Sequence, residues 1–401
     1  MLFRFCGPLR TFLQICRSDT TCNVVVCPTG SLSIDINRQD LFAIRRSPRL
    51  WQPQCTGCAV KYFDKSGFRA GLVAALIVAT MIVIGSRWLR YFDWALTTYA
   101  VGSIFAAFAV AYRYAVWAQR PPTKMYVNRG WRLFFAPQAK RRKLGTLLLN
   151  NFVLQTFITK RSSQRWIMHA CLSWGGMLAF ALTFPLVFGW LHFETLPNDA
   201  ETYRVFLFGF AVEQFPIHSF RGFMHFNLLN IAAVVLVVGL ILSVKLRMSD
   251  RSELAIQSFA DDVFPVLLLF AVAVTGLMLT VSAKSMDGYG FPFIGMAHAA
   301  SVIALLLFLP FGKLFHIVQR PLSLGVSFYK DAGEKGPRAV CLRCGGDFAS
   351  QMHVQDLKKV LDQIGFNFRF QTSNGELHYQ DICPPCRRRL FALNQGRALG
   401  R

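Results

Sequence analysis

Four histidines in apolar segments are the residues of this chain best suited to hold a cofactor. His298 and His316 are 18 residues apart within one apolar stretch, residues 293–319. If that stretch is one helix, a rise of about 1.5 Å per residue separates the two imidazoles by roughly 27 Å, near the thickness of a bilayer core. His169 and His225 lie in the first turns of two other apolar segments. Neutral imidazole is a good axial ligand for haem iron. The pattern therefore predicts two stacked b-type haems, with one haem as the minimum.

The elements that must position these histidines are membrane helices. Hydrophobic residues make up 53% of the 401 residues and the mean hydropathy is +0.37, which a soluble protein surface would not allow. Six segments reach the length of about 20 apolar residues that crosses a bilayer. They cover residues 69–88, 94–117, 166–190, 222–246, 263–283 and 293–319. The sequence therefore predicts an all-α transmembrane helical bundle of about six helices, with small cysteine-rich extramembrane domains at its N- and C-terminal ends.

The distribution of charge sets the expected orientation of these helices. The formal net charge is +23, and residues 119–166 hold 11 Lys and Arg residues and no acidic residue. Such an excess is typical of a cytoplasmic loop, whereas the more acidic loop 190–221 is expected outside. With six crossings both termini lie in the cytoplasm, and we expect a multi-pass protein of a bacterial-type inner (plasma) membrane. Because the basic residues flank membrane helices, nucleic-acid binding is not expected.

The same topology pairs the histidines by depth. The third span enters from the cytoplasm and the fourth from outside, so His169 lies near the inner face and His225 near the outer face. In the sixth span His298 is the outer histidine and His316 the inner one. We therefore expect His169 and His316 to hold an inner haem. His225 and His298 would hold an outer haem, with His218 as an alternative to His225. Any of these histidines could instead bond a carbonyl or a lipid headgroup at its helix end.

Three parts of the sequence resemble a family of membrane cytochromes. They are RWIMHACLSWGGMLAF at 165–180, NIAAVVLVVGLILSVKLRM at 230–248 followed by FADDVFPVLLLFAVAVTGL at 259–277, and HAASVIALLLFLPFGKLFH at 298–316. They are similar to the cytochrome b (gamma) subunit of respiratory nitrate reductases. They are equally similar to the membrane cytochromes of heterodisulfide reductase and of complexes linked to dissimilatory sulfite reductase. The resemblance covers about residues 160–325.

The resemblance implies a set of haem ligands. His298 and His316 match the histidine pair on the family's last helix, and His169 matches the inner ligand on its second helix. The nitrate reductase subunits carry another ligand ten residues further along that helix, where this chain has Ala179. His225 would therefore have to supply the fourth ligand if two haems are bound.

The resemblance also implies quinone chemistry, because such subunits exchange electrons with a membrane quinone pool and pass them through haem to a soluble partner. The chain is then the quinone-reactive electron-transfer subunit of an oxidoreductase complex, with cytoplasmic redox subunits as partners. Lys284, Asp287 and Arg221 are candidates for the quinone site or are ordinary interfacial anchors. The alternative is a polytopic transporter with protonatable histidines, or a membrane-anchor scaffold without haem.

Paired cysteines near the C-terminus predict a metal centre. Cys341 and Cys344 lie in the motif CLRC, and Cys383 and Cys386 lie in the motif CPPC. Four thiolates at that spacing can surround zinc or a rubredoxin-like iron ion, and an iron–sulfur cluster would use the same ligand type. Between the pairs, residues 354–366 place apolar side chains on one face, which predicts a short amphipathic helix.

A second group of cysteines lies near the N-terminus. CPTGSLSID from Cys27 and QCTGC at 54–58 are similar to parts of bacterial ferredoxin cluster motifs. Asn23 and Lys61 stand where ferredoxins place cysteines, which excludes a regular two-cluster ferredoxin. What remains is one [4Fe-4S] cluster, or a degenerate domain that binds zinc or nothing. The cluster ligands would be Cys22, Cys27, Cys55 and Cys58, with Cys16 as an alternate.

These features divide the chain into four parts. Residues 1–65 form a cysteine-rich, ferredoxin-like domain, and residues 66–160 hold two transmembrane helices and the basic cytoplasmic segment. Residues 161–325 form a four-helix cytochrome b domain. Residues 338–392 form a metal-binding domain with four cysteine ligands.

Overall fold

The computed structural model describes residues 64–135, 141–197, 199–249, 255, 257–366, 368–372 and 375–398. The described residues fall into two compact units. The membrane unit lies within Asp64–Val116 and Lys140–Pro321, and the C-terminal unit lies within Trp117–Ala139 and Leu322–Arg401. The N-terminal cluster ligands predicted from the sequence, Cys22, Cys27, Cys55 and Cys58, lie outside the described residues.

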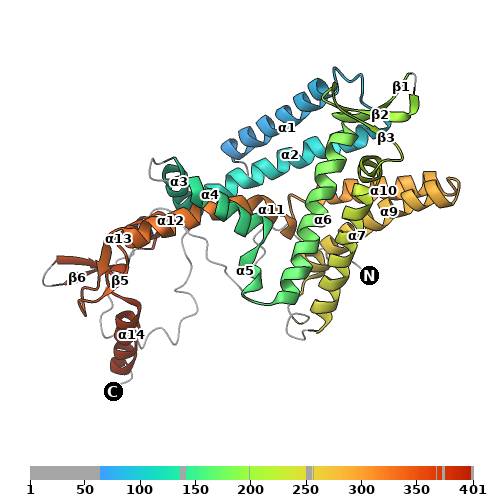
Figure 1. The fold of residues 1–401 in the computed structure, drawn as a ribbon. Helices are drawn as coiled ribbons and strands as arrows, with labels where there is room; N and C mark the ends of the chain where they lie inside the picture. The colour runs from blue at the N-terminus through green and yellow to red at the C-terminus, as the bar shows by residue number, and fades with distance from the viewer. Residues whose placement is uncertain are drawn as a thin grey trace, which may run out of the picture. The chain divides into compact units, whose positions relative to one another are not determined.

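Six of the described helices are long and apolar enough to cross a membrane, which confirms the predicted number of spans (Figure 1). They are α1 (Lys65–Gly85), α2 (Thr97–Ala118), α6 (Ser163–Val187), α7 (Phe220–Ser249), α9 (Phe264–Ser285) and α10 (Phe291–Phe308). A 3-10 turn (Trp94–Leu96) precedes α2, and a π-helical turn (Phe259–Val263) precedes α9. Many of their large apolar side chains are exposed, as expected of surfaces that face lipid. The chain is a multi-pass membrane protein.

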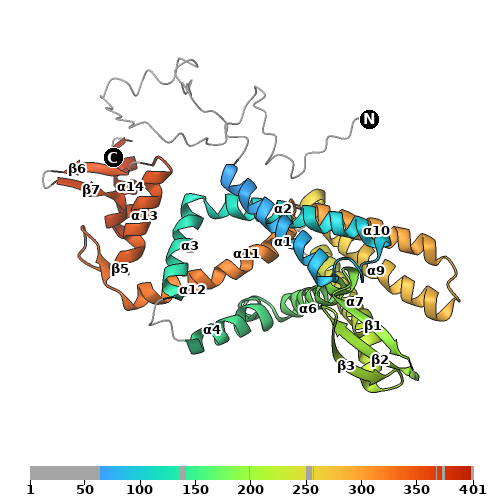
Figure 2. The ribbon, with the colours of Figure 1, turned by 90° about the horizontal axis from the view of Figure 1, so that it is seen from above.

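Helices α6, α7, α9 and α10 pack in the order of the chain, each against the next (Figures 1 and 2). The contact between α6 and α7 is close because each helix offers a glycine to the other. A Cβ atom placed on Gly175 would lie 2.7 Å from the backbone nitrogen of Leu236, and one placed on Gly239 would lie 2.8 Å from that of Leu172. Small residues at such positions let membrane helices approach closely.

The sixth span is shorter than the sequence predicted. Helix α10 ends at Phe308 with Leu309 as its C-cap, and the next residue, Pro310, has no N–H to continue the helical hydrogen bonds. The chain then forms a 3-10 turn (Lys313–Phe315) and a short helix, α11 (His316–Gln319), followed by a further 3-10 turn (Arg320–Leu322). His298 and His316 therefore lie on different helices, and the separation expected for a single straight helix does not apply.

An arginine of α2 holds this break in the sixth span. The guanidinium of Arg113 donates a hydrogen bond to the carbonyl of Pro310, and its carbon lies 4.3 Å from the ring centroid of Phe315. The ring of Phe315 is buried. The break is thus a packed part of the membrane unit.

The loop between α6 and α7 forms an antiparallel sheet that the sequence did not predict. Its strands are β1 (Leu191–Leu196), β2 (Asp199–Leu207) and β3 (Phe210–Pro216), in the order β1-β2-β3. The turn between β2 and β3 consists of Phe208 and Gly209, both with positive φ (51° and 75°), as a two-residue hairpin of the right twist requires. Phe215 of β3 is fully buried and anchors the sheet.

The remaining elements of the membrane unit connect α3 of the C-terminal unit to α6. They are α4 (Arg141–Leu148), a π-helical turn (Leu149–Val153) and α5 (Thr156–Thr159). Helix α6 begins at the cap residue Ser162, whose side chain accepts a hydrogen bond from the backbone N–H of Arg165.

The C-terminal unit combines helices with two small hairpins (Figure 2). Its elements are α3 (Pro121–Phe134), α12 (Ser323–Lys335), β4 (Arg338–Val340), β5 (Asp347–Ser350), α13 (Gln351–Gln363), β6 (Arg369–Thr372), β7 (Gly375–His378), a 3-10 turn (Tyr379–Asp381) and α14 (Pro384–Ala398). Helix α13 confirms the predicted amphipathic helix, with Val354 and Val360 buried on one face.

One buried carboxylate joins three helices of the C-terminal unit. Asp356 of α13 is only 3% exposed, and it accepts two hydrogen bonds, of 2.8 and 3.0 Å, from Arg129 of α3. Tyr329 of α12 donates a third, of 3.2 Å. The hydrogen bond from Arg129 to Asp356 raises the pKa of Arg129, and burial beside Asp356 raises the pKa of Tyr329. Both partners therefore stay protonated, and the carboxylate is matched by donors.

Replacement of Asp356 by alanine should loosen this junction. It leaves Arg129 and Tyr329 without their acceptor, and we expect the free energy of unfolding of the C-terminal unit to fall by about 2 kcal/mol. This is less than for a fully buried pair, because Arg129 can turn to solvent. Hydrogen exchange of the α13 amides in the full chain measures this loss. The matched double variant Arg129→Met with Asp356→Leu removes both charges and should recover most of it. Unchanged exchange in Asp356→Ala would show that the junction is not stabilising.

Candidate metal centre and membrane histidines

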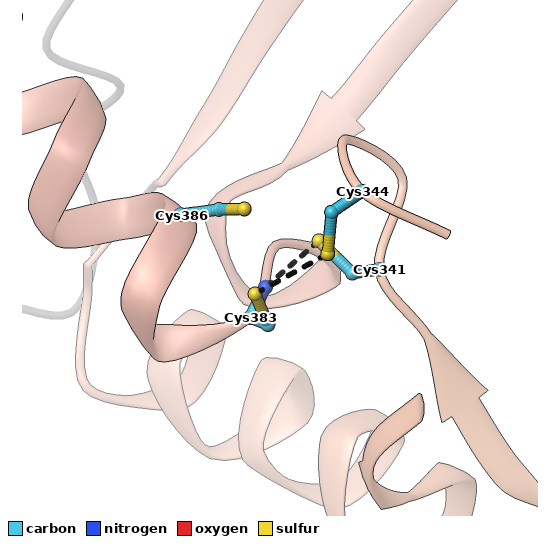
Figure 3. A group of neighbouring side chains, drawn as sticks. All are labelled: Cys341, Cys344, Cys383 and Cys386. Atoms are coloured by element: carbon cyan, nitrogen blue, oxygen red, sulfur yellow. Dashed lines mark hydrogen bonds between the residues drawn. The ribbon is translucent and has the colours of Figure 1, made fainter. Parts of the chain in front are cut away.

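Four cysteines of the C-terminal unit point their sulfurs toward one another (Figure 3). Cys341 and Cys344 lie on the turn after β4, Cys383 directly precedes α14, and Cys386 lies in its first turn. All four sulfurs lie within 4.8 Å of one another, and the sulfurs of Cys344 and Cys383 are 3.8 Å apart. A tetrahedral zinc ion with Zn–S bonds of about 2.3 Å would separate its ligands by roughly 3.8 Å. The structure thus brings together the four predicted ligands in a cluster that could bind a metal ion.

Backbone hydrogen bonds hold the two cysteine turns together. The N–H of Cys383 donates to the sulfur of Cys341 at 3.2 Å, and the N–H of Leu342 donates to the carbonyl of Asp381 at 3.1 Å. Gly345 takes a positive φ of 71° and donates to the carbonyl of Cys341, which closes the first turn. The geometry of the centre therefore comes mainly from the backbone.

The thiols of this centre differ in their acidity. Burial opposes ionisation of Cys341, but N–H groups directed at its sulfur outweigh that effect and lower its pKa to about 6. Hydrogen bonds to neighbouring sulfurs, first that of Cys383, raise the pKa of Cys386 to about 12. Four thiolates this close would repel one another, so full ionisation of the group requires a cation between them.

An ion pair connects the metal centre to α13. Lys358 of α13 lies 2.5 Å from a carboxylate oxygen of Asp381, two residues before Cys383. The same helix carries Asp356, which binds Arg129 of α3. Helix α13 therefore contacts both the segment that carries Cys383 and helix α3.

Three of the four predicted haem ligands use the same ring nitrogen for a hydrogen bond to the protein. Nδ1 of His169 lies 2.6 Å from the side-chain oxygen of Gln155, and Nδ1 of His316 lies 2.7 Å from the carbonyl of Lys313. Nδ1 of His298 lies 2.9 Å from the hydroxyl of Thr275. The first two partners can only accept, and the hydroxyl of Thr275 already donates to a carbonyl of its own helix. Each ring is therefore protonated at Nδ1.

The other ring nitrogen of these three histidines, Nε2, makes no hydrogen bond to any residue that the structure describes. Its lone pair is the one that would bind a metal. His169 also lies close enough to His316 and Arg320 to interact with them electrostatically. The structure thus places the predicted inner pair in the same neighbourhood.

The predicted outer pair is not brought together. His225 uses Nε2, at 3.3 Å from Glu213, and its ring stacks on Phe215 of the sheet with centroids 4.6 Å apart. His298 lies beside Thr275 in the middle of α9.

Hydrogen bonds between α7 and α9 show how far apart these two levels are. Thr280 of α9 donates to Asn230 of α7 at 2.9 Å, which places these two residues at one level. His225 lies five residues from Asn230 toward one end of the pair, and Thr275 lies five residues from Thr280 toward the other, so the two levels are roughly 15 Å apart along the antiparallel helices. The equal depth expected for His225 and His298 is therefore not found, because the offset of packed helices cannot be read from one sequence.

Gln155 is a residue of this site that the sequence did not indicate. It is 4% exposed and adopts a left-handed conformation with φ of 50° and ψ of 41°, which is strained for a residue with a Cβ. Its amide nitrogen donates to Ser173 at 2.7 Å and to the carbonyl of Phe152 at 3.3 Å, which turns its oxygen toward His169. A glutamine in an apolar run, 14 residues before His169, was the only signal in the sequence.

Comparisons with protein-family models, curated proteins and solved structures found no match to this chain. The resemblance to membrane cytochromes therefore depends on the sequence segments quoted above and remains an expectation.

Metal analysis of purified protein should find roughly one ion per chain at the four-cysteine centre. Cys344→Ser changes the exposed ligand and should cause most of this metal to be lost, because three thiolates hold an ion less tightly. Cys171→Ser on α6 is the matched control and should retain it. If wild type and Cys344→Ser contain equal metal, the centre does not bind through these thiols.

Proposed function

We propose that this chain is a membrane cytochrome b, an electron-transfer subunit that exchanges electrons between the quinone pool and a cytoplasmic oxidoreductase partner. The observation that carries the proposal is the shared state of the membrane histidines. His169, His298 and His316 each donate Nδ1–H to a fixed oxygen and keep the lone pair of Nε2 for a ligand. Metal-binding histidines usually carry such a hydrogen bond on the ring nitrogen that does not bind the metal.

The residues fit a haem at His169 and His316. Both imidazoles donate Nδ1–H and lie on different helices, and Arg320 lies near enough to interact with His169. The guanidinium of Arg320 would pair with a haem propionate. Its central carbon, Cζ, lies 4.8 Å from the ring centroid of Phe157. Gly176 lies two turns after His169, and a Cβ placed there would meet nothing within 4 Å, which leaves room beside the face of α6 that carries His169. When bound, haem supplies one-electron chemistry that side chains lack.

The proposal is restricted to this inner haem. A second haem, as expected from the sequence, would need His225 to leave Glu213 and reach the level of His298. For the four-cysteine centre we propose zinc, because zinc needs no redox partner and its closed tetrahedral site matches the hydrogen-bonded turns. We also propose the inner membrane and cytoplasmic termini, on the strength of the basic segment 119–166.

A reduced-minus-oxidised absorption spectrum of the purified protein tests this function. Bis-histidine b haem gives a sharp α band near roughly 560 nm. His169→Ala and His316→Ala should each abolish the band, because both ligands belong to one iron. His225→Ala is the matched control and should retain it, since this ring is bound to Glu213. A folded wild type with no band would favour a transporter or scaffold, and loss of the band in His225→Ala alone would refute the pairing.

Gln155 should set the electron density on His169. Gln155→Glu gives Nδ1–H a charged acceptor, which makes the imidazole a stronger donor and should lower the midpoint potential of the haem. Gln155→Leu removes the acceptor and should raise it. Ser173→Ala changes only the far end of Gln155 and should have a small effect. Redox titration of the α band measures all three, and equal potentials would show that Gln155 has no influence on the ligand.

A further inference from the structure

Helix α3 begins where a membrane helix ends. Helix α2, one of the six that can cross a bilayer, ends at Ala118, and α3 begins at Pro121. Only two residues separate them, so the start of α3 cannot lie far from the membrane surface.

One side of α3 is used for packing within the C-terminal unit. A Cβ placed on Gly130 would lie 2.7 Å from the Cα of Gly325 on α12, and the ring of Tyr126 meets that of Tyr329 edge-on with centroids 5.2 Å apart. Arg129, on the same side, binds Asp356. This side fixes how α3 is rotated.

The other side of α3 carries aromatic and basic side chains. Lys124, Asn128, Trp131 and Phe135 follow one another at helical spacing and are exposed. Trp131 is 66% exposed and Phe135 65%, and their rings pack edge-on with centroids 5.1 Å apart. Arg132, also exposed, lies beside them. Large aromatic rings flanked by Lys and Arg are typical of helices that lie in the lipid–water interface.

The segment that contains α3 carries charge of one sign. Residues 119–166 contain 11 Lys and Arg residues and no Asp or Glu. A surface of anionic phospholipids attracts such a segment. A protein partner would need acidic groups there, but chain continuity with α2 already supplies a lipid surface at this position.

We propose that α3 lies in the headgroup layer of an anionic membrane surface. Trp131 and Phe135 enter the boundary of the acyl chains, and Lys124 and Arg132 meet lipid phosphates. The C-terminal metal unit is then held at the membrane through the side of α3 that binds α12 and α13. This inference is independent of the haem proposal.

Site-specific photocrosslinking in the full chain tests the occupant of this surface. A photoreactive phenylalanine analogue at position 131 is illuminated in nanodiscs of phosphatidylcholine with phosphatidylglycerol and in native membranes. We expect lipid adducts there. The matched control is position 391 on α14, where Phe391 is 63% exposed in the same unit, and it should give few. Protein adducts at 131, no adducts, or equal lipid yields at both positions would overturn the proposal.

Charge variants test the headgroup contact separately. Lys124→Glu with Arg132→Glu should reduce the lipid adduct yield at position 131 several-fold in the phosphatidylglycerol nanodiscs, because repulsion replaces attraction. The chain without these two charge changes should show a similar fall in lipid adduct yield when the nanodiscs contain phosphatidylcholine alone. Both positions are exposed, so α3 should keep its packing on α12. A yield that is indifferent to the charge of either the protein or the lipid would overturn the assignment to an anionic surface.

Discussion

A polar N–H group inside a bilayer must find its acceptor within the protein, and this requirement organises the histidines of the membrane unit. His169 and His298, which lie on spans, each give Nδ1–H to a side-chain oxygen of another segment. His316, which follows the sixth span, gives its Nδ1–H to the carbonyl of Lys313 three residues earlier. That one hydrogen bond fixes the tautomer, restrains the ring and exposes the lone pair of Nε2. For His169 the acceptor is a strained, buried glutamine, Gln155, which is itself held by Ser173. The proposed ligand chemistry follows from these bonds.

A second constraint governs the C-terminal unit, where charged groups at its packing contacts are paired with partners of opposite charge. The cysteine turns are held by backbone donors, Asp381 near them pairs with Lys358, and Asp356 on the same helix pairs with Arg129. A bound metal ion would therefore make α13 more rigid, and α13 would in turn restrain α3 from rotating about its own axis. The proposed lipid contact of Trp131 depends on that rotation, because the same helix presents its packed side to α12.

Sequence patterns predicted those features that depend on local composition. Apolar runs predicted the six spans, and the spacing of CLRC and CPPC predicted the cysteine cluster. Features that depend on packing were missed. The run 293–319 was interpreted as one helix because Pro310 lies among apolar residues, and the strands between α6 and α7 have too mixed a pattern to predict a sheet. The offset of α7 against α10, which separates His225 from His298, is set by contacts between helices. The contact of Gln155 is with His169 on another helix, and the sequence does not show which residues meet across helices.

We propose that the Nε2 atoms of His169 and His316 bind one haem iron. Electron paramagnetic resonance of the oxidised protein, with haem quantified in the same sample, tests it most directly. The account predicts about one haem per chain with a low-spin ferric signal of bis-imidazole type, which becomes high-spin or disappears when either histidine is removed. A native, folded preparation that contains no porphyrin, or a low-spin signal that survives His316→Ala unchanged, would contradict it.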